Sequence, residues 1–147
     1  MAYAVRRNKL TEAIWRLHGV LFRISGGRIG GKIVGLPVLM LTTKGRKSGE
    51  PRSNVLTYLP KGRASVVFAS NAGEPRHPGW WLNLLTDPHA TVQRGQELFP
   101  VIAREAEGEE RAQLWDEIVR AYDGYAEYER RTTRRIPVVV LEPASGR

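Results

Sequence analysis

The side chains best able to bind an anion are concentrated in one short segment. It contains Lys44, Gly45, Arg46, Lys47, Ser48, Gly49, Arg52, Ser53 and Asn54. Lysine and arginine at this density suit a phosphate or several carboxylates, because charge-assisted hydrogen bonds are strong. The two glycines would let a ligand approach the backbone amides. A basic turn can also be merely solvated, but the neighbouring hydroxyl and amide donors favour an anion site.

A second group of residues could act on a planar molecule. Tyr122, Tyr125 and Tyr128 recur every three residues around Gly124. On a helical or near-helical segment this spacing places three phenols along one side. Phenols can form the wall of a ring-binding pocket and donate protons, but they can equally be part of a core. The composition of the segment leaves both interpretations open.

The remaining motifs point to one further ligand-facing loop and exclude several kinds of chemistry. The segment 70–78 is rich in turn-forming residues and leads into a helix, whose free amides favour an electron-rich ligand edge. The three histidines show no metal-ligand spacing, so we predict no metal. The chain has no cysteine and no G-x-S-x-G motif, which argues against nucleophilic hydrolysis. The glycine-rich stretch 26–32 is not a P-loop, because Ile33 stands where the hydroxyl residue belongs.

The elements that would position these residues are mainly strands. Apolar and β-branched runs predict strands at 37–43, 52–59, 64–70, 90–95, 97–105 and 136–141. Short connections at Lys61-Gly62 and Gly95-Gln96 leave no room for crossovers, so the sheet is predicted to be mostly antiparallel. Closing it into a small barrel would remove its exposed edges. Helical patterns at 78–85 and 107–121 interrupt the strands. The predicted fold class is therefore α+β and mainly β, with about six strands.

The N-terminal segment has a different character. Residues 5–24 predict a basic amphipathic helix, with apolar residues on one side and cations with two aromatics beside them. Such a helix can rest on an anionic membrane surface, or pack on the domain with its cations in water. The organisation predicted is an N-terminal helix with a glycine-rich connection over 1–30, followed by a single domain over 31–147.

Composition sets the class of the protein and of its partner. The chain has 147 residues, 41% of them hydrophobic, which suits one globular domain, and no apolar run reaches the length of a transmembrane helix. Residues 1–63 carry 13 Lys/Arg against 2 Asp/Glu, a net charge of +11, whereas residues 64–147 carry 10 against 13, a net charge of −3. This asymmetry predicts an acidic partner, which could be nucleic acid, anionic lipid or a polyanionic small molecule.

Taken in order, these motifs resemble one known family, the actinobacterial deazaflavin-dependent nitroreductases. The resemblance extends from about Gly30 to Pro143 with matching gaps. It rests on the segment 43–49, Arg52, Asn54, the pair 69–70, the segment 78–84, the three tyrosines and the segment 136–138.

The resemblance implies a split β-barrel of the flavin-reductase type and the coenzyme F-420. This cofactor is an 8-hydroxy-5-deazaflavin whose tail carries a phosphate and an oligoglutamate chain, a polyanion that would suit the basic hairpin. The resemblance implies that Lys44, Arg46, Lys47 and Arg52 bind the tail, that Asn54 and the loop 70–72 meet the ring, and that Trp80 and Asn83 close over it. The full set of expected cofactor-binding residues is Lys44, Gly45, Arg46, Lys47, Ser48, Arg52, Asn54, Ser70, Asn71, Ala72, Arg76, Pro78, Trp80 and Asn83. The expected catalytic residues are Tyr122, Tyr125, Tyr128 and Ser70.

The function implied is hydride transfer to a planar, electron-poor acceptor such as a quinone, nitroaromatic or enone, with a tyrosine as proton donor. Trp81 stands where tyrosine is frequent in the family, so we expect the acceptor pocket to differ there.

We expect a cytoplasmic protein, peripheral at the inner face of the membrane through its N-terminal helix, and a monomer or weak dimer that binds no nucleic acid. Two alternatives remain, an FMN-binding split-barrel protein and a basic nucleic-acid-binding module. FMN lacks the oligoglutamate, and single-strand binders interleave aromatics with cations, which this chain does not.

Overall fold

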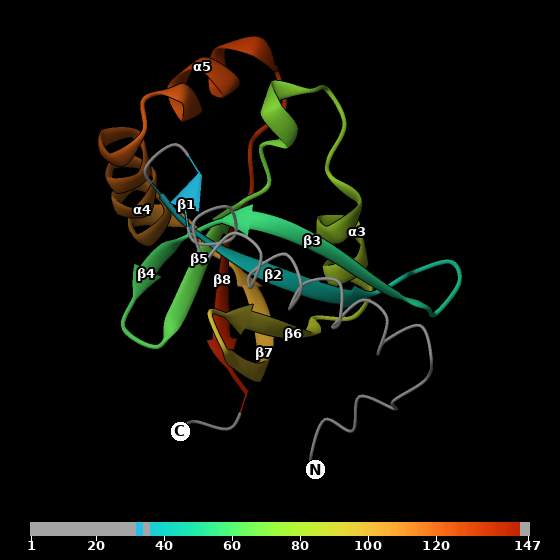
Figure 1. Ribbon diagram of the computed structural model, residues 1–147. Helices are drawn as coiled ribbons and strands as arrows, with labels where there is room; N and C mark the ends of the chain where they lie inside the picture. Colours follow the sequence, from blue (N-terminus) through green and yellow to red (C-terminus); the bar gives the residue numbers. More distant parts are fainter. Residues whose placement is uncertain (1–31, 34–35, 145–147) are drawn as a thin grey trace.

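The computed structural model describes residues 32–33 and 36–144, which form a strongly curled antiparallel sheet flanked by helices (Figure 1). The predicted helix 5–24, the expected boundary at residue 30 and the last three residues lie outside the described part. None of the helices within that part is long and apolar enough to cross a membrane.

The sheet of the described residues has eight strands, and every pairing is antiparallel, as the short connections predict. The strands are β1 (Lys32–Ile33), β2 (Leu36–Lys44), β3 (Pro51–Thr57), β4 (Leu59–Lys61), β5 (Ala64–Phe68), β6 (His89–Arg94), β7 (Glu97–Glu105) and β8 (Val138–Pro143). Two hairpins turn through only two residues, and their first residues, Gly62 and Gly95, have φ of +61° and +59°. A glycine at this position is what a type II′ hairpin turn requires.

The sheet closes on itself through the segment 51–61. Its neighbours run β1-β2-β6-β7-β8-β5-β4, and β3 pairs with the free side of β2. The predicted strand 52–59 is therefore divided at Tyr58, whose N–H donates to Pro37 O over 3.0 Å. Its first half pairs with β2 and its second half with β5. This bend joins the two ends of the sheet and leaves a split between β3 and β5.

Alternate residues of the strands fill the interior of the barrel. Leu39 and Leu41 of β2, Val92 of β6, and Val139 and Leu141 of β8 are all almost fully buried there. Period-two alternation directs these side chains to one face, as expected for strands. The helix α3 (Gly79–Thr86) lies alongside β2 and β3 and adds Trp80, Trp81 and Leu84 to this cluster.

Two helices cover the outer face of β5 and β8. They are α4 (Gly108–Ala121) and α5 (Gly124–Arg131), and they pack Leu114, Ile118 and Tyr125 against Phe68 and Val140. Helix α4 matches the predicted 107–121. The separate helix α5 adds to the two predicted insertions: the tyrosine spacing allows a helix there, but the packing on Phe68 that stabilises it is not visible in the sequence. Gly124 is needed for a steric reason, since a Cβ there would collide with the ring of Tyr122.

The contribution of this outer cluster to stability can be tested with Ile118→Ala. Ile118 is fully buried and lines none of the cavities described below. We expect the free energy of unfolding to fall by about 2–5 kcal/mol, because the deletion leaves a cavity as well as losing buried apolar surface. Urea denaturation measures it, with Leu85→Ala, at a site 61% exposed, as a control that should stay within about 0.5 kcal/mol. A loss below 0.5 kcal/mol in Ile118→Ala would mean that α4 does not fold as part of the barrel.

Candidate functional site

The basic hairpin between β2 and β3 has an ordered tip. Gly45 N–H donates to Glu50 O over 2.8 Å, and Gly49 adopts φ of +74° to complete the turn. The hydroxyl oxygen of Ser48 accepts from Glu50 N–H at 3.1 Å and from Arg52 Nη2 at 3.3 Å. A Cβ at Gly45 would lie 2.9 Å from Glu50 O, so only glycine fits. The turn thus holds its cations in place by contacts of its own.

Asn83 connects this hairpin to α3. Its Oδ1 accepts from the backbone N–H of Arg46 at 3.1 Å and from Arg46 Nη1 at 2.9 Å, and its Nδ2 donates to Thr43 Oγ1 at 3.0 Å. Asn83 is 4% exposed, so these bonds also satisfy a buried amide. Arg46 is therefore oriented by a buried side chain, and its guanidinium keeps further donors free for a ligand.

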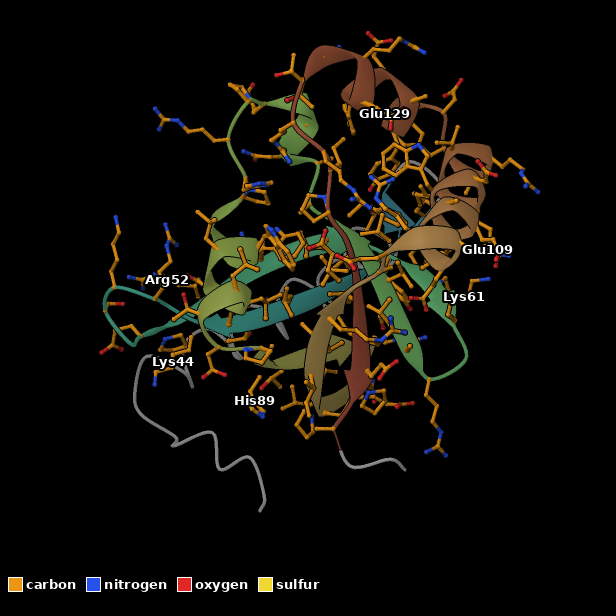
Figure 2. All side chains as sticks on the ribbon, turned by 180° about the vertical axis from the view of Figure 1, so that it is seen from behind. Lys44, Arg52, Lys61, His89, Glu109 and Glu129 are labelled. Atoms are coloured by element: carbon orange, nitrogen blue, oxygen red, sulfur yellow. The ribbon has the colours of Figure 1, made fainter. Side chains whose placement is uncertain are left out.

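The hairpin and α3 enclose a cavity of about 290 Å³, which we call the cationic cavity. Its lining residues are Gly45, Arg46, Lys47, Ser48, Arg52, Asn54, Gly79, Trp80 and Asn83. Figure 2 shows Lys44 and Arg52 together at this end of the molecule, far from Lys61 of β4 and Glu109 of α4. Three cations line the cavity and no acid does, so it suits an anionic group.

A second cavity of about 520 Å³, the aromatic cavity, occupies the split between β3 and β5. It is lined by Asn54, Val55, Leu56, Thr57, Phe68, Ser70, Asn71, Ala72, Arg76, His77, Pro78, Gly79, Trp80, Tyr125 and Tyr128. Asn54, Gly79 and Trp80 line both cavities, so the two adjoin. Together they place a cavity with aromatic side chains in its wall next to a cavity lined by cations.

The loop after β5 forms one wall of the aromatic cavity. Asn71 and Ala72, within the 3-10 turn η1 (Asn71–Gly73), have φ of 47° and 55°, an uncommon conformation for residues with a Cβ. Gly73 has φ of +80°, and a Cβ there would lie 3.0 Å from Cβ of Arg131 and 3.1 Å from Tyr128 O. The loop therefore packs directly on α5, which brings the tyrosines to the same cavity.

The three tyrosines, Tyr122 at the end of α4 and Tyr125 and Tyr128 on α5, meet edge to face. The ring centroids of Tyr122 and Tyr125 are 5.8 Å apart, and those of Tyr125 and Tyr128 are 5.5 Å apart. The Tyr125 hydroxyl forms a 2.7 Å hydrogen bond with Thr57 Oγ1 on β3. Burial is the main reason why the pKa of the Tyr125 phenol is raised above its ordinary value, and partial burial also raises the pKa of Tyr128. Both phenols are therefore neutral and able to donate at neutral pH.

The structure gathers nearly all the residues singled out from the sequence. Every expected cofactor-binding residue except Lys44 lines one of the two cavities, and so do Tyr125, Tyr128 and Ser70. Asn83 lies in the cationic cavity, not over the aromatic one, and Tyr122 lines neither. Trp81 is 5% exposed, belongs to the same buried cluster as Trp80 and lines neither cavity, so the expectation that it alters the acceptor pocket stays a prediction.

Sequence reasoning missed several lining residues. They are Val55, Leu56, Thr57, Phe68, His77 and Gly79. The first three follow Asn54 along β3, the strand that borders the split. His77 was considered only as a metal ligand, although it stands within the loop that leads to α3. In the described residues, no group of three His, Asp or Glu side chains is placed to hold a metal ion.

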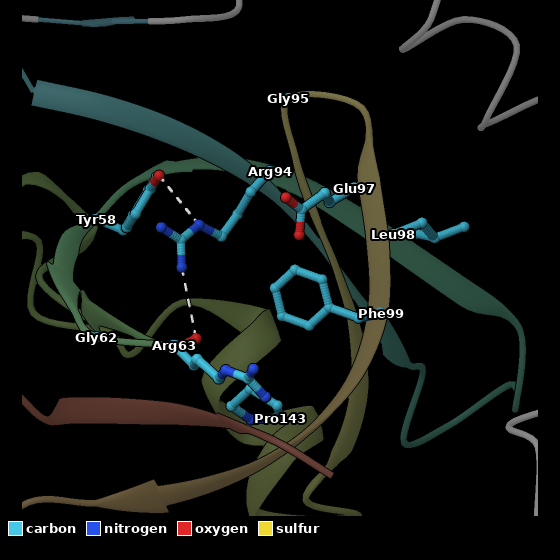
Figure 3. Close-up of a pocket in the computed structure, with 9 residues that line it drawn as sticks. All are labelled: Tyr58, Gly62, Arg63, Arg94, Gly95, Glu97, Leu98, Phe99 and Pro143. Carbon is cyan, nitrogen blue, oxygen red and sulfur yellow. Dashed lines mark hydrogen bonds between the residues drawn. The ribbon is translucent and has the colours of Figure 1, made fainter. Parts of the chain in front are cut away.

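A larger cavity of about 810 Å³ lies at the opposite end of β5 (Figure 3). Here Arg94 stacks 4.7 Å over the ring of Tyr58 and donates to its hydroxyl at 3.2 Å. Arg94 also donates to Ser65 Oγ at 3.3 Å and to Arg63 O at 3.5 Å. These bonds brace the bend between β3 and β4. None of the expected site residues lines this cavity, so its size does not identify the functional site.

Comparison with known proteins identifies the family of the chain. A family model described as F-420H(2)-dependent quinone reductase matches residues 14–143. An F-420H(2)-dependent quinone reductase of Mycobacterium tuberculosis is 41% identical, over 86% of this chain and 87% of the relative. A solved F-420-H2 dependent reductase, FDR-A, is 41% identical with a TM-score of 0.67, over 72% of this chain and 94% of that one. Another solved relative, described as a domain-swapped dimer, is 35% identical with a TM-score of 0.68, over 89% of this chain and 99% of that one. The fold is thus the split barrel of these reductases, and the chain belongs to the F-420H(2)-dependent quinone reductase family.

Proposed function

We propose that the protein reduces quinones with F-420H2, and that the two adjoining cavities receive the tail and the ring of this cofactor. The observation that carries the proposal is the shared wall at Asn54, Gly79 and Trp80, which joins a cationic cavity to an aromatic one. A phosphate and oligoglutamate tail attached to a planar ring has the same two-part character. Membership of the family supports F-420 as the cofactor.

The cationic cavity would hold the tail through Arg46, Lys47 and Arg52, with Ser48 adding a hydroxyl donor. Arg46 is oriented in advance by Asn83, so binding costs less side-chain entropy than for a free arginine. Lys44 is exposed beside the cavity and would add attraction at longer range, which salt screens.

The aromatic cavity would hold the ring between Trp80, the β3 residues 54–57 and the loop 70–72. When bound, the reduced deazaflavin supplies a hydride, and the chain has to orient the two rings, exclude water and deliver a proton. Ser70 is 7% exposed and lines the cavity, so its hydroxyl is available to a ring oxygen or nitrogen.

Tyr125 is the residue best placed to deliver the proton. Its hydroxyl lies 2.7 Å from Thr57 Oγ1, which orients it at the edge of the aromatic cavity. Reduction of a quinone adds a hydride and a proton, and a neutral phenol can give the proton to a quinone oxygen as negative charge develops there. Tyr128, next along α5, lines the same cavity and completes its wall.

A binding experiment tests the assignment of the two cavities. The apoprotein is titrated with F-420, with its ring portion lacking phosphate and glutamates, with FMN and with a short oligonucleotide, and fluorescence is followed. We expect F-420 to bind most tightly, with an affinity that falls as salt rises, and the ring portion to bind more weakly and almost independently of salt. Equal or tighter binding of FMN or of the oligonucleotide would contradict the proposal.

Quinone is the acceptor class that we propose, because the relatives are described as quinone reductases. Reduction of nitroaromatics or enones stays a prediction from the sequence. Three further expectations also stay predictions, since no described residue tests them. They are contact of the segment 5–24 with an anionic membrane, a peripheral location at the membrane, and a monomeric or weakly dimeric state.

A further inference from the structure

Arg134, in the turn before β8, binds the loop that forms one wall of the aromatic cavity. Its Nε donates to Glu74 O at 3.0 Å, its Nη1 to Ala69 O at 3.0 Å, and its Nη2 to Ser70 O at 2.7 Å. A fourth contact joins Nη1 to Nδ1 of His77 at 3.1 Å. One guanidinium thus fixes both ends of the loop.

These bonds hold a backbone that is otherwise unfavourable. Asn71 and Ala72 are in the left-handed region, which asparagine tolerates but which costs about 1–2 kcal/mol for a residue such as Ala72. The Asn71 side chain donates to Arg76 O at 3.1 Å and closes the loop from within. Because the loop is held from both sides, the position of His77 at its end is well defined.

The contact with Arg134 also determines which nitrogen of His77 carries the proton. A guanidinium has only donors, so Nδ1 must accept, and the proton of the neutral ring is on Nε2. Burial, and then the charge of Arg134, lower the pKa of His77, while Glu105 at the end of β7 raises it by less. His77 lines the aromatic cavity together with Trp80 and Tyr128.

We propose that His77 donates a hydrogen bond from Nε2 to a carbonyl oxygen of the ring bound in the aromatic cavity, and that Arg134 is its positioning residue. The inference rests on the proposed function, because both the deazaflavin and the quinone carry conjugated ring carbonyls. A neutral donor aimed at such an oxygen stabilises it as negative charge develops during reduction. His77 transfers no proton in this role, which leaves the general acid to Tyr125.

Two substitutions at His77 separate the donor from the loop contact. The amide of His77→Asn can still accept from Arg134 near the position of Nδ1, but it places no donor near Nε2. The longer amide of His77→Gln places an N–H near Nε2. The affinity for F-420 without quinone reports a bond to the cofactor, and the KM for a water-soluble naphthoquinone reports a bond to the acceptor.

We expect His77→Asn either to lower the affinity for F-420 or to raise the KM for the naphthoquinone, in each case about three- to tenfold, the range for one neutral hydrogen bond. In His77→Gln both the affinity and the KM should stay within about twofold of the wild-type values. Melting temperatures should be similar in the two variants. Wild-type affinity and KM in His77→Asn would overturn the inference. If the wild-type protein did not bind F-420 at all, the proposed function would be overturned instead.

Ring ¹⁵N NMR of the free protein tests the tautomer without any cofactor. We expect a neutral His77 protonated at Nε2 and titrating below pH 6.5. In Arg134→Met the titration midpoint should move up, because the positive charge beside the ring is removed. A ring protonated at Nδ1 in the wild type would contradict the inference whatever the protein binds.

Discussion

Replacing Tyr125 with phenylalanine should lower the turnover of a quinone acceptor about 10²–10³-fold, the range for loss of a general acid. The affinity for F-420 should be nearly unchanged, because phenylalanine keeps the ring that packs against Phe68 and Tyr128. Steady-state kinetics with a naphthoquinone measure the effect. Because burial raises the pKa of Tyr125, the wild-type turnover should decline only above about pH 10, where the phenol would lose its proton.

Tyr122→Phe is the matched control for this variant. Tyr122 belongs to the same edge-to-face row, but it does not line the aromatic cavity. Its variant should therefore keep wild-type turnover. Thr57→Val removes the hydrogen-bond partner of Tyr125 at nearly constant volume and should lower turnover less than Tyr125→Phe does. Full activity of Tyr125→Phe would exclude Tyr125 as the proton donor.

The second large effect is expected in the cationic cavity. Arg46→Ala should weaken F-420 binding by about 1–3 kcal/mol, because it removes hydrogen bonds from a charged donor to an anionic tail. The loss should shrink as salt rises, since exposed charges are screened. Fluorescence titration measures it, and Lys47→Ala should act in the same direction without disturbing the contacts of Asn83.

Arg63→Ala provides the control for charge alone. Arg63 is exposed and lies at the other end of β5, beside the cavity that Arg94 braces. Its removal lowers the net charge of the protein by the same amount as Arg46→Ala, so the F-420 affinity should change much less. Equal losses in the two variants would show that binding depends on net charge, not on the hairpin.

The sequence predicted those parts of the fold that local patterns encode. The three hairpins could be located because glycines and strand-like runs lie next to one another. Helix α3 could be located from the proline in its first turn and the Asp87-Pro88 stop, and α4 because apolar residues recur at helical spacing. The bend at Tyr58 could not be predicted, because it depends on the pairing of one continuous segment with two different strands. The helix α5 was missed because its stability comes from aromatic packing on Phe68, far away in sequence.

The same distinction applies to the candidate site. The cations of the hairpin and the row of tyrosines are visible as residue types at short spacing. The hydrogen bonds that orient them join residues far apart in the chain. Thr57 meets Tyr125 across 68 residues, and Arg134 meets His77 across 57. A single sequence carries no local sign of such pairs, and Arg134 sits among other arginines that look like an ordinary solvated run.

The division of the site between different elements has an evolutionary consequence. The cationic cavity is built from the β2–β3 hairpin and α3, whereas Tyr125 and Tyr128 belong to α5, a short helix on the outer side of the barrel. Under the proposed assignment, mutations in α5 alter the wall that faces the acceptor without touching the hairpin contacts proposed for the coenzyme tail. Relatives with this architecture can therefore come to differ in the molecules that they reduce while they bind the same electron donor.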